Sequence, residues 1–286
     1  SSGAALRRST RATTMCRRCP PTAALTERLR PDLVLVTGDM VAGQRAGLDY
    51  GAMWAGWHRA VTDPPRAAGI LMAVTPGNHD ASGYPLRYSF ADRGAFFVSL
   101  DATTVGPMSA EPRQWVDAQL AASTAPVKIA FGHLSLHPAT VGRETEVLAD
   151  PELEAIFRRR GLTAYVSGHQ HGYYPGARNG LRLVSMACLG AGPRILVGTT
   201  ATSTQAMLTL EVRDGRVASL EALAAPGFTR TIARDAPRGD SLRRAARHPR
   251  RPRGLLRRGP KRRQAALRRW SSGGGVPSVR GRRRRR

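Results

Sequence analysis

Four short motifs in the chain each place a glycine directly before a side chain that can bind a metal ion. The motifs are Gly38-Asp39, Gly77-Asn78-His79-Asp80, Gly132-His133 and Gly168-His169-Gln170-His171. They offer carboxylate, amide and imidazole ligands, a mixture that suits Mn, Fe, Zn, Ni or Co better than calcium or a thiolate zinc site. The motifs therefore predict a site for a divalent transition metal.

The motifs follow segments that read as buried strands. Short β-branched runs bounded by turn residues predict strands at Asp32–Thr37, Ile70–Thr75, Ala95–Leu100, Val127–Phe131 and Leu162–Ser167. Four of these five strands lead directly into a motif. Because ligand sites in open α/β sheets lie beyond the carboxyl ends of the strands, we expect the four motifs to converge on one edge. Glycine at these points lets the backbone turn sharply and lets neighbouring segments approach.

Taken singly, each motif has a simpler structural interpretation. A Gly-Asp after a strand is usually a turn, and a lone Gly-His is more often a packed or exposed histidine than a ligand. Asn-His-Asp in a loop can serve as a set of side-chain-to-backbone hydrogen bonds. However, five of the seven histidines lie within or beside the strand-end motifs. This concentration favours the metal site.

Helical patterns alternate with the predicted strands. They cover Leu48–Val61, Glu111–Ala121 with Ser109 as a candidate cap, and Pro151–Arg160 with Asp150 at the cap. Alternation of strands and helices predicts an α/β layered fold. After residue 180 shorter runs predict a closing meander of antiparallel strands. These runs are Leu181–Ala187, Arg194–Val197, Ala206–Val212 and Val217–Leu220.

The net charge of +25 is concentrated at the two ends of the chain. Residues 1–30 carry 7 basic residues and 1 acid, and residues 241–286 carry 19 basic residues and no acid. The middle is neutral and long enough to bury a sizeable core in a chain that is 41% hydrophobic. We therefore expect a basic arm over 1–21, a folded domain over 22–234 and a disordered Arg-rich tail over 235–286.

The basic tail has three interpretations. It is a solvated segment, an arm that contacts the phosphates of nucleic acid, or the product of a shifted reading frame in a GC-rich gene. The first and third are favoured, because the tail offers only one aromatic residue, Trp270, to stack on bases. No run approaches the roughly 18 apolar residues that a membrane span needs, and no signal peptide is evident, which favours a cytoplasmic location.

In this order, Gly-Asp, Gly-Asn-His-Asp, Gly-His and Gly-His-x-His resemble the calcineurin-like metallophosphoesterases over roughly residues 22–223. The resemblance implies a layered sandwich of two mixed β-sheets flanked by helices. It also implies two metal ions and a phosphate mono- or diester as substrate. In the family scheme Asp39 would bridge the metals, Asn78, His133 and His169 would complete the second metal, and His171 would belong to the first.

The same resemblance gives His79 a role outside the ligand set. It would stabilise charge on the transferring phosphoryl group or protonate the leaving oxygen, with Asp80 holding its ring. A histidine is well suited to this task, because its ordinary pKa near 6.5 lets it transfer a proton at neutral pH. Two metal ions that share a bridging water would supply the hydroxide nucleophile.

One family motif has no counterpart in the sequence. The family opens with Asp-x-His, which holds the first metal, whereas residues 1–30 contain neither Asp nor His. Either the true amino terminus is missing or replaced, or the chain is a single-metal or inactive relative that acts as a binding module. Cys16, Cys19 and Glu27 are the nearby potential ligands, but their spacing does not favour a replacement site.

Overall fold

A computed structural model describes residues 10–11, 28–43, 46–80 and 87–233 of the chain. The chain divides into two compact units, residues 1–249 and 250–286. All described residues belong to the first unit. Apart from Thr10 and Arg11, the predicted arm over 1–21 and the predicted tail over 235–286 lie outside the described residues, so their division from the domain stays a prediction.

A six-stranded mixed sheet forms the centre of the first unit, with the order β4-β5-β6-β7-β9-β8. Its four inner strands run parallel, and the edge strands β4 and β8 run antiparallel to their neighbours. The bounds are β4 Tyr88–Asp92, β5 Ala95–Ser99, β6 Val127–Gly132, β7 Ala164–Ser167, β8 Tyr174–Arg178 and β9 Leu181–Ser185.

Two smaller sheets face the six-stranded sheet. In one, β2 (Leu33–Val36) pairs in parallel with β3 (Leu71–Val74). The other is antiparallel in the order β1-β10-β11-β12. Its strands are β1 Thr10–Arg11, β10 Ala206–Arg213, β11 Arg216–Ala224 and β12 Arg230–Thr231.

Strand β2 is buried on both of its faces. Leu33 and Leu35 enter the core between the sheets, together with Phe97 and Ile129 from the facing sheet. Val34 and its neighbours on the opposite face of the strand pack against Trp57 and the helical layer outside. A strand covered on both sides must be apolar throughout, which is why the sequence reads as a continuous apolar run here.

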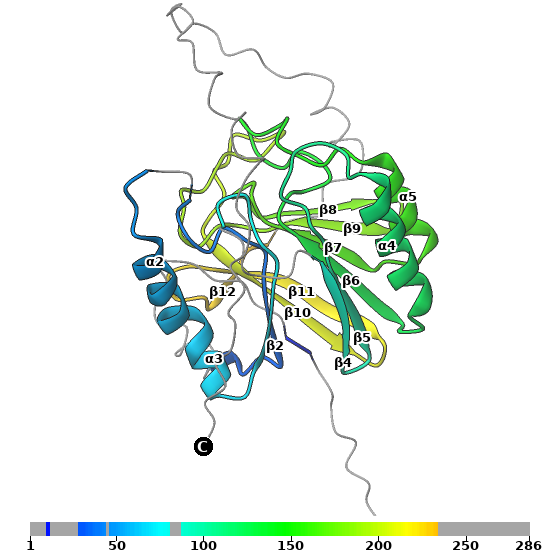
Figure 1. The fold of residues 1–286 in the computed structure, drawn as a ribbon, viewed down its shortest axis with the longest axis horizontal. Coiled ribbons are helices and arrows are strands. Elements are labelled where there is room, and N and C mark those ends of the chain that lie inside the picture. The colour runs from blue at the N-terminus through cyan, green and yellow to red at the C-terminus, as the bar shows by residue number, and fades with distance from the viewer. Residues whose placement is uncertain (1–9, 12–27, 44–45, 81–86, 234–286) are drawn as a thin grey trace, which may run out of the picture. The chain divides into compact units, whose positions relative to one another are not determined.

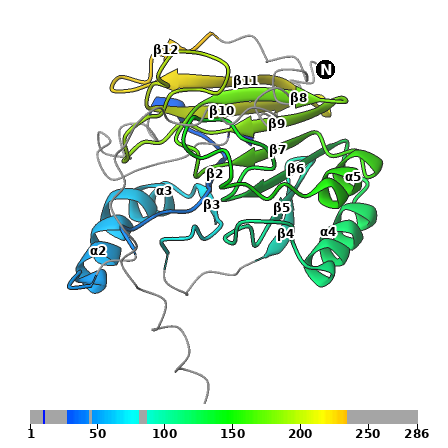
Figure 2. The ribbon, with the colours of Figure 1, turned by 90° about the horizontal axis from the view of Figure 1, so that it is seen from above.

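Helices form the outer layers. The pair α4 (Ala110–Ala122) and α5 (Pro151–Arg159) packs on the outside of the six-stranded sheet, and the segment α2 (Tyr50–Trp57), η1 (His58–Thr62) and α3 (Asp63–Ala67) packs outside β2 and β3. Figure 1 shows these two helical groups on opposite sides of the sheets, and Figure 2 shows the same layers from above.

The predicted α/β layered sandwich is confirmed, and the five predicted strands occur within two residues of their expected ends. The cap of α5 is also confirmed, because the Asp150 carboxylate accepts from the Leu153 backbone N–H at 2.9 Å. Ser109 precedes α4, but its side chain makes no capping hydrogen bond. The predicted helix over 48–61 begins at Tyr50 instead and changes to a π-helical turn after Trp57.

The predicted antiparallel meander is only partly correct. Strands β10 and β11 form a hairpin, but β9 joins the six-stranded sheet parallel to β7. The run Arg194–Val197 forms only isolated bridges rather than a strand. The edge strands β4 and β8 were not predicted. Edge strands bury one face weakly, so they lack the apolar run that marks the inner strands.

Within the described residues, no helix combines the length and the apolar character that a membrane span requires.

Candidate metal centre

The loops after β2, β3, β6 and β7 carry the four motifs, and their glycines allow these loops to touch. Gly38 has a left-handed backbone (φ 88°), and a Cβ there would come within 2.8 Å of His133 Nδ1. A Cβ on Gly77 would overlap the backbone nitrogen and the carboxylate of Asp39. The glycines therefore permit the close approach that the sequence predicted.

His133 is the central residue of the cluster and is 1% exposed. Its Nδ1 donates to the Thr37 carbonyl oxygen at 2.7 Å. With that proton in place, the neutral ring presents a lone pair at Nε2. Nε2 faces Asn78 Oδ1 at 2.9 Å, His169 Nδ1 at 3.1 Å and Asp39 Oδ2 at 3.3 Å.

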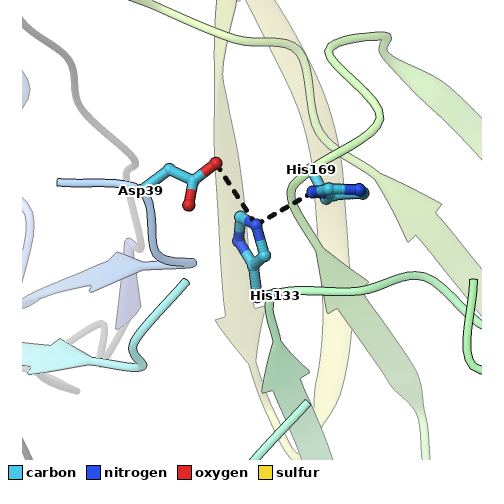
Figure 3. A group of neighbouring side chains, drawn as sticks. All are labelled: Asp39, His133 and His169. Carbon is cyan, nitrogen blue, oxygen red and sulfur yellow. Dashed lines mark hydrogen bonds and ion pairs between the residues drawn. The ribbon is translucent and has the colours of Figure 1, made fainter. Parts of the chain in front are cut away.

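These atoms form a set of converging ligands. Asp39, His133 and His169 each offer one ligand atom, and all three atoms lie within 4.8 Å of one another. Figure 3 shows the Asp39 carboxylate and the His169 ring directed toward the same nitrogen of His133. Electron pairs that converge in this way repel one another unless a cation lies among them. The donor set of one carboxylate, two imidazoles and the nearby Asn78 amide fits a divalent transition metal.

Glu146 orients the ring of His169. The Glu146 carboxylate oxygen Oε2 lies 2.8 Å from His169 Nε2, on the side of the ring away from the cluster. A proton held at Nε2 by this contact leaves a lone pair at Nδ1, which lies 3.1 Å from His133 Nε2 and 3.1 Å from Arg143 Nη1. Carboxylates commonly fix metal-binding histidines in this manner.

Arg143 also contacts His169. Its Nη1 donates to the His169 carbonyl oxygen at 3.0 Å and lies 2.9 and 3.1 Å from the two ring nitrogens. The same Nη1 is 3.1 Å from Glu146 Oε2. Neither Arg143 nor Glu146 was predicted, because both lie in an irregular loop with no recognisable spacing from the motifs.

The Gln170 side chain holds the loop that contains Arg143 and Glu146 in place through hydrogen bonds. Its side-chain oxygen accepts from the backbone N–H groups of Ala139 and Thr140, and its nitrogen donates to the carbonyls of Arg143 and Glu146. The Gln170 side chain is fully buried. The middle residue of Gly-His-x-His therefore positions the loop that supports its neighbour His169.

His171 does not join the cluster of Asp39, His133 and His169. It lines the same cavity of about 400 Å³ as those residues. Its Nδ1 lies 3.3 Å from the Gly192 carbonyl oxygen, on the loop after β9. Burial and the charges of Arg143 and Arg194 lower the pKa of His171 to about 4.

His79 lines the cavity but is also absent from the ligand cluster. Its backbone N–H donates to Asp39 Oδ1 at 3.1 Å. The contacts of Asp80 differ from the expected support of the His79 ring. Its carboxylate accepts from the backbone N–H groups of Gly77, Asp39 and Met40 at 2.6 to 2.8 Å. Asp80 thus joins the loops after β2 and β3.

The pKa values of the cluster residues favour the protonation states that bind a cation. Burial opposes the ionisation of Asp39, but positive charge and hydrogen bonding at His133 and at the His79 backbone N–H outweigh it and lower the Asp39 pKa to about 2. A metal ion bound to the neutral His133 ring would supply that positive charge. Burial lowers the pKa of His169 to about 4, assisted by positive charge at His133 and Arg143. The carboxylate is therefore ionised and the His169 ring neutral at pH 7, as metal ligands must be.

Three of the candidate ligands have left-handed backbones. The φ angles are 56° for Asp39, 60° for His169 and 56° for His171. Residues other than glycine adopt this conformation at a cost, and such strain clusters at functional sites.

Two solved structures are similar to this chain in fold. Purple acid phosphatase PPD1 from yellow lupin (Lupinus luteus) seeds has a TM-score of 0.57 and 13% identity, over 82% of this chain and 55% of that one. This chain thus spans little more than half the length of that phosphatase. GAP50, the anchor in the inner membrane complex of Plasmodium, has a TM-score of 0.55 and 12% identity, over 80% of this chain and 90% of that one.

No curated protein sequence matches the chain. The family model of the calcineurin-like phosphoesterases matches residues 16–173, more than half of the chain. The match includes the loops that hold Asp39, Asn78, His133 and His169. By this match, with the layered fold and the converging ligands in agreement, the chain belongs to the calcineurin-like phosphoesterase family.

Proposed function

We propose that the chain hydrolyses phosphate esters with a divalent transition metal held by Asp39, Asn78, His133 and His169. The observation that carries the proposal is the convergence of Asn78 Oδ1, His169 Nδ1 and Asp39 Oδ2 on Nε2 of His133. When bound, a metal here polarises a phosphate oxygen and lowers the pKa of a coordinated water.

The remaining steps depend on side chains of the cavity. His79 lies beside Asp39 on the cavity wall and outside the ligand cluster, which supports its proposed role as the group that protonates the leaving oxygen. Asp80 supports this role through the backbone, because it fixes the loop that presents His79. His171 lines the same cavity outside the ligand cluster, and we assign it as the proposed ligand of a further metal ion.

Metal content and hydrolysis together test this proposal. The full chain, loaded with Mn²⁺ or Zn²⁺ and desalted, should retain at least one equivalent of metal by mass spectrometry. It should also release 4-nitrophenol from an aryl phosphate. His133→Ala should lose both properties, whereas His58→Ala, an exposed histidine on the outer helical segment, should keep both. Retention of full metal content by His133→Ala would contradict the ligand assignment.

A second function is a binding role without catalysis. GAP50, which shares the fold, is described as an anchor of a membrane complex. The same experiment separates the two functions. A chain that retains no metal and hydrolyses neither an aryl phosphate nor its diester would favour the binding role.

The basic residues of 241–286 support a further proposal, that this segment contacts the phosphates of nucleic acid. Retention on heparin should fall steeply with salt for the full chain. Deletion of residues 235–286 should abolish the retention and leave hydrolysis unchanged. Equal retention after the deletion would refute the contact.

A further inference from the structure

A second cavity, here named the apolar cavity, adjoins the cavity that contains the candidate metal ligands. It has a volume of about 500 Å³ and is formed by the loop after β9, the residues just before β10 and the loop between β11 and β12. Leu189, Gly190 and Ala191 line both cavities, so the two cavities meet along this segment. Gly190 is exposed and has no side chain that could obstruct passage between them.

The walls of the apolar cavity carry no charge in the described part of the chain. Leu189 and Phe228 are buried and belong to one hydrophobic cluster, against which Ala225 packs. Cavities of about 300–1,000 Å³ with mostly apolar walls are typical of small-molecule sites. The size and the lining of the apolar cavity therefore suit a small organic group.

The apolar cavity offers few hydrogen bonds to a ligand. Among the described residues that line it, only Thr204 and Gln205 have polar side chains. Gln205 Nε2 donates to the carbonyl oxygens of Leu189 and Ala191 at 3.2 and 3.1 Å, so both hydrogens of this amide are engaged by the segment that the two cavities share. The polar atoms of a sugar or a nucleobase would lose water here without gaining partners, which is unfavourable.

The shared segment continues an apolar part of the wall of the metal cavity. Met186, Ala187 and Leu189 line the metal cavity from the loop after β9, whereas the candidate ligands line it from the loops after β2, β6 and β7. Small or apolar residues thus form the wall that leads from the metal cavity to the apolar cavity. This wall suits an ester whose organic group extends from the first cavity into the second.

We propose that the apolar cavity binds the organic group of the ester whose phosphate group lies at the candidate metal ligands. The proposal rests on the proposed function, since it names the substrate class of the same site. The organic group is an uncharged alkyl or aryl group, which leaves water on binding with a gain proportional to the apolar area buried. Phosphate esters of sugars and nucleosides are poor substrates by the same argument.

Binding of alkylphosphonates tests the apolar cavity without turnover, because their carbon–phosphorus bond is not hydrolysed. Calorimetry on the metal-loaded full chain compares ethylphosphonate with hexylphosphonate, whose chain is longer by about four methylene groups. Burial of these groups should make hexylphosphonate bind about 50- to 200-fold more tightly, at about three- to fourfold per methylene. Equal affinities of the two phosphonates would overturn the proposal.

Variants of Thr204 test whether the alkyl chain lies in the apolar cavity. Thr204→Glu places a carboxylate there and should lower the ratio of the two affinities at least about tenfold, whereas Thr204→Val should keep the ratio. The ratio cancels any effect of the new charge on the phosphonate group itself. Thr200→Glu, at an exposed position of the same loop, is the matched control and should keep the wild-type ratio. Metal content and thermal unfolding establish that each variant is folded.

Hydrolysis of ethyl and hexyl phosphate, measured as released phosphate, separates this proposal from the proposed function. The wild type should have the higher kcat/KM for hexyl phosphate, and Thr204→Glu should reduce that preference. An affinity ratio that depends on Thr204, in a chain that hydrolyses neither ester, would overturn the hydrolytic function and leave the apolar cavity as a binding site. Hydrolysis of both esters, with an affinity ratio that is unchanged in folded Thr204→Glu, would overturn the role of the apolar cavity alone.

Discussion

His133 joins two sheets of the fold through a hydrogen bond from its Nδ1 to the carbonyl oxygen of Thr37 at 2.7 Å. The two residues are 96 positions apart and stand at the carboxyl ends of β6 and β2. The same bond fixes the ring so that Nε2 faces the cluster. Formation of the metal site and assembly of the sandwich are therefore coupled at this residue.

The coupling predicts that His133→Ala destabilises the protein even without metal. The substitution leaves the Thr37 carbonyl without its partner, which should cost about 1–3 kcal/mol of the free energy of unfolding. Urea denaturation in the presence of a chelator measures this loss. His58→Ala is exposed and should change the free energy of unfolding by less than about 0.5 kcal/mol. Equal stabilities of the two variants would show that the bond to Thr37 has no structural role.

The position of His79 predicts a different phenotype. His79→Ala should reduce turnover by about two to four orders of magnitude while metal content stays at the wild-type level. His169→Ala should lose metal as well as turnover, because its Nδ1 faces the cluster. The two assays on the same preparations distinguish a proton donor from a ligand. If His79→Ala loses as much metal as His169→Ala, the role of His79 is wrong.

Glu146 should control metal affinity through His169. Glu146→Ala removes the acceptor at Nε2 and should weaken metal binding about 10- to 100-fold, while Glu146→Gln, which retains an acceptor oxygen, should have a smaller effect. Competition with a fluorescent chelator measures the affinity. Glu144→Ala in the same loop is the control, because within the described part of the chain the Glu144 carboxylate accepts from the Gly142 backbone N–H and does not contact His169. Unchanged affinity in Glu146→Ala would leave the contact without a role in binding.

The lowered pKa values predict acid sensitivity of the metal-free protein. The pKa of His169 and of His171 is about 4 in the fold, against an ordinary value of 6.5. Between these limits the unfolded chain binds more protons, so the free energy of unfolding falls as the pH drops from 6.5 toward 4. Asp39, with a pKa of about 2 against 3.8, extends the loss to lower pH.

Urea midpoints measured with a chelator at several pH values between about 7 and 4 test this pH dependence. His171→Gln removes one titrating ring and should lose less stability over that interval than the wild type. Identical pH profiles for the two proteins would mean that His171 does not contribute.

The four motif loops could be predicted from the sequence because each one interrupts an apolar strand with a glycine and a polar ligand. Parallel pairing brings the Asp39 loop beside the Asn78 loop in one sheet and the His133 loop beside the His169 loop in another, and packing of the two sheets brings these pairs together. The supporting residues could not be predicted in this way. Arg143 and Glu146 reach His169 through an irregular loop held by Gln170, and loop paths depend on tertiary hydrogen bonds rather than on periodicity.

The same limit explains the errors in the fold. The run at Arg194–Val197 has the composition of a strand, but it is a connection fixed by the backbone contacts of Arg194 to His171 and Ser203. The sequence of β9 predicts a strand in a series of hairpins, because β8 lies between β7 and β9 along the chain. In the sheet, however, β9 lies between β7 and β8 and pairs with both. Neither the isolated bridges of Arg194–Val197 nor the pairing of β9 with β7 can be recognised from the local sequence, because strand pairing depends on tertiary burial and twist.

The left-handed backbones of Asp39, His169 and His171 make glycine, rather than alanine, the better substitution for removing these side chains. Alanine is the standard replacement in ligand scanning, but it adopts positive φ poorly, whereas glycine adopts it freely. A glycine variant at these three positions should therefore be folded more stably than the alanine variant, and at Asp39 and His169 it should be equally unable to bind metal in the cluster. Loss of metal binding in the glycine series can then be assigned to the missing ligand rather than to a distorted turn.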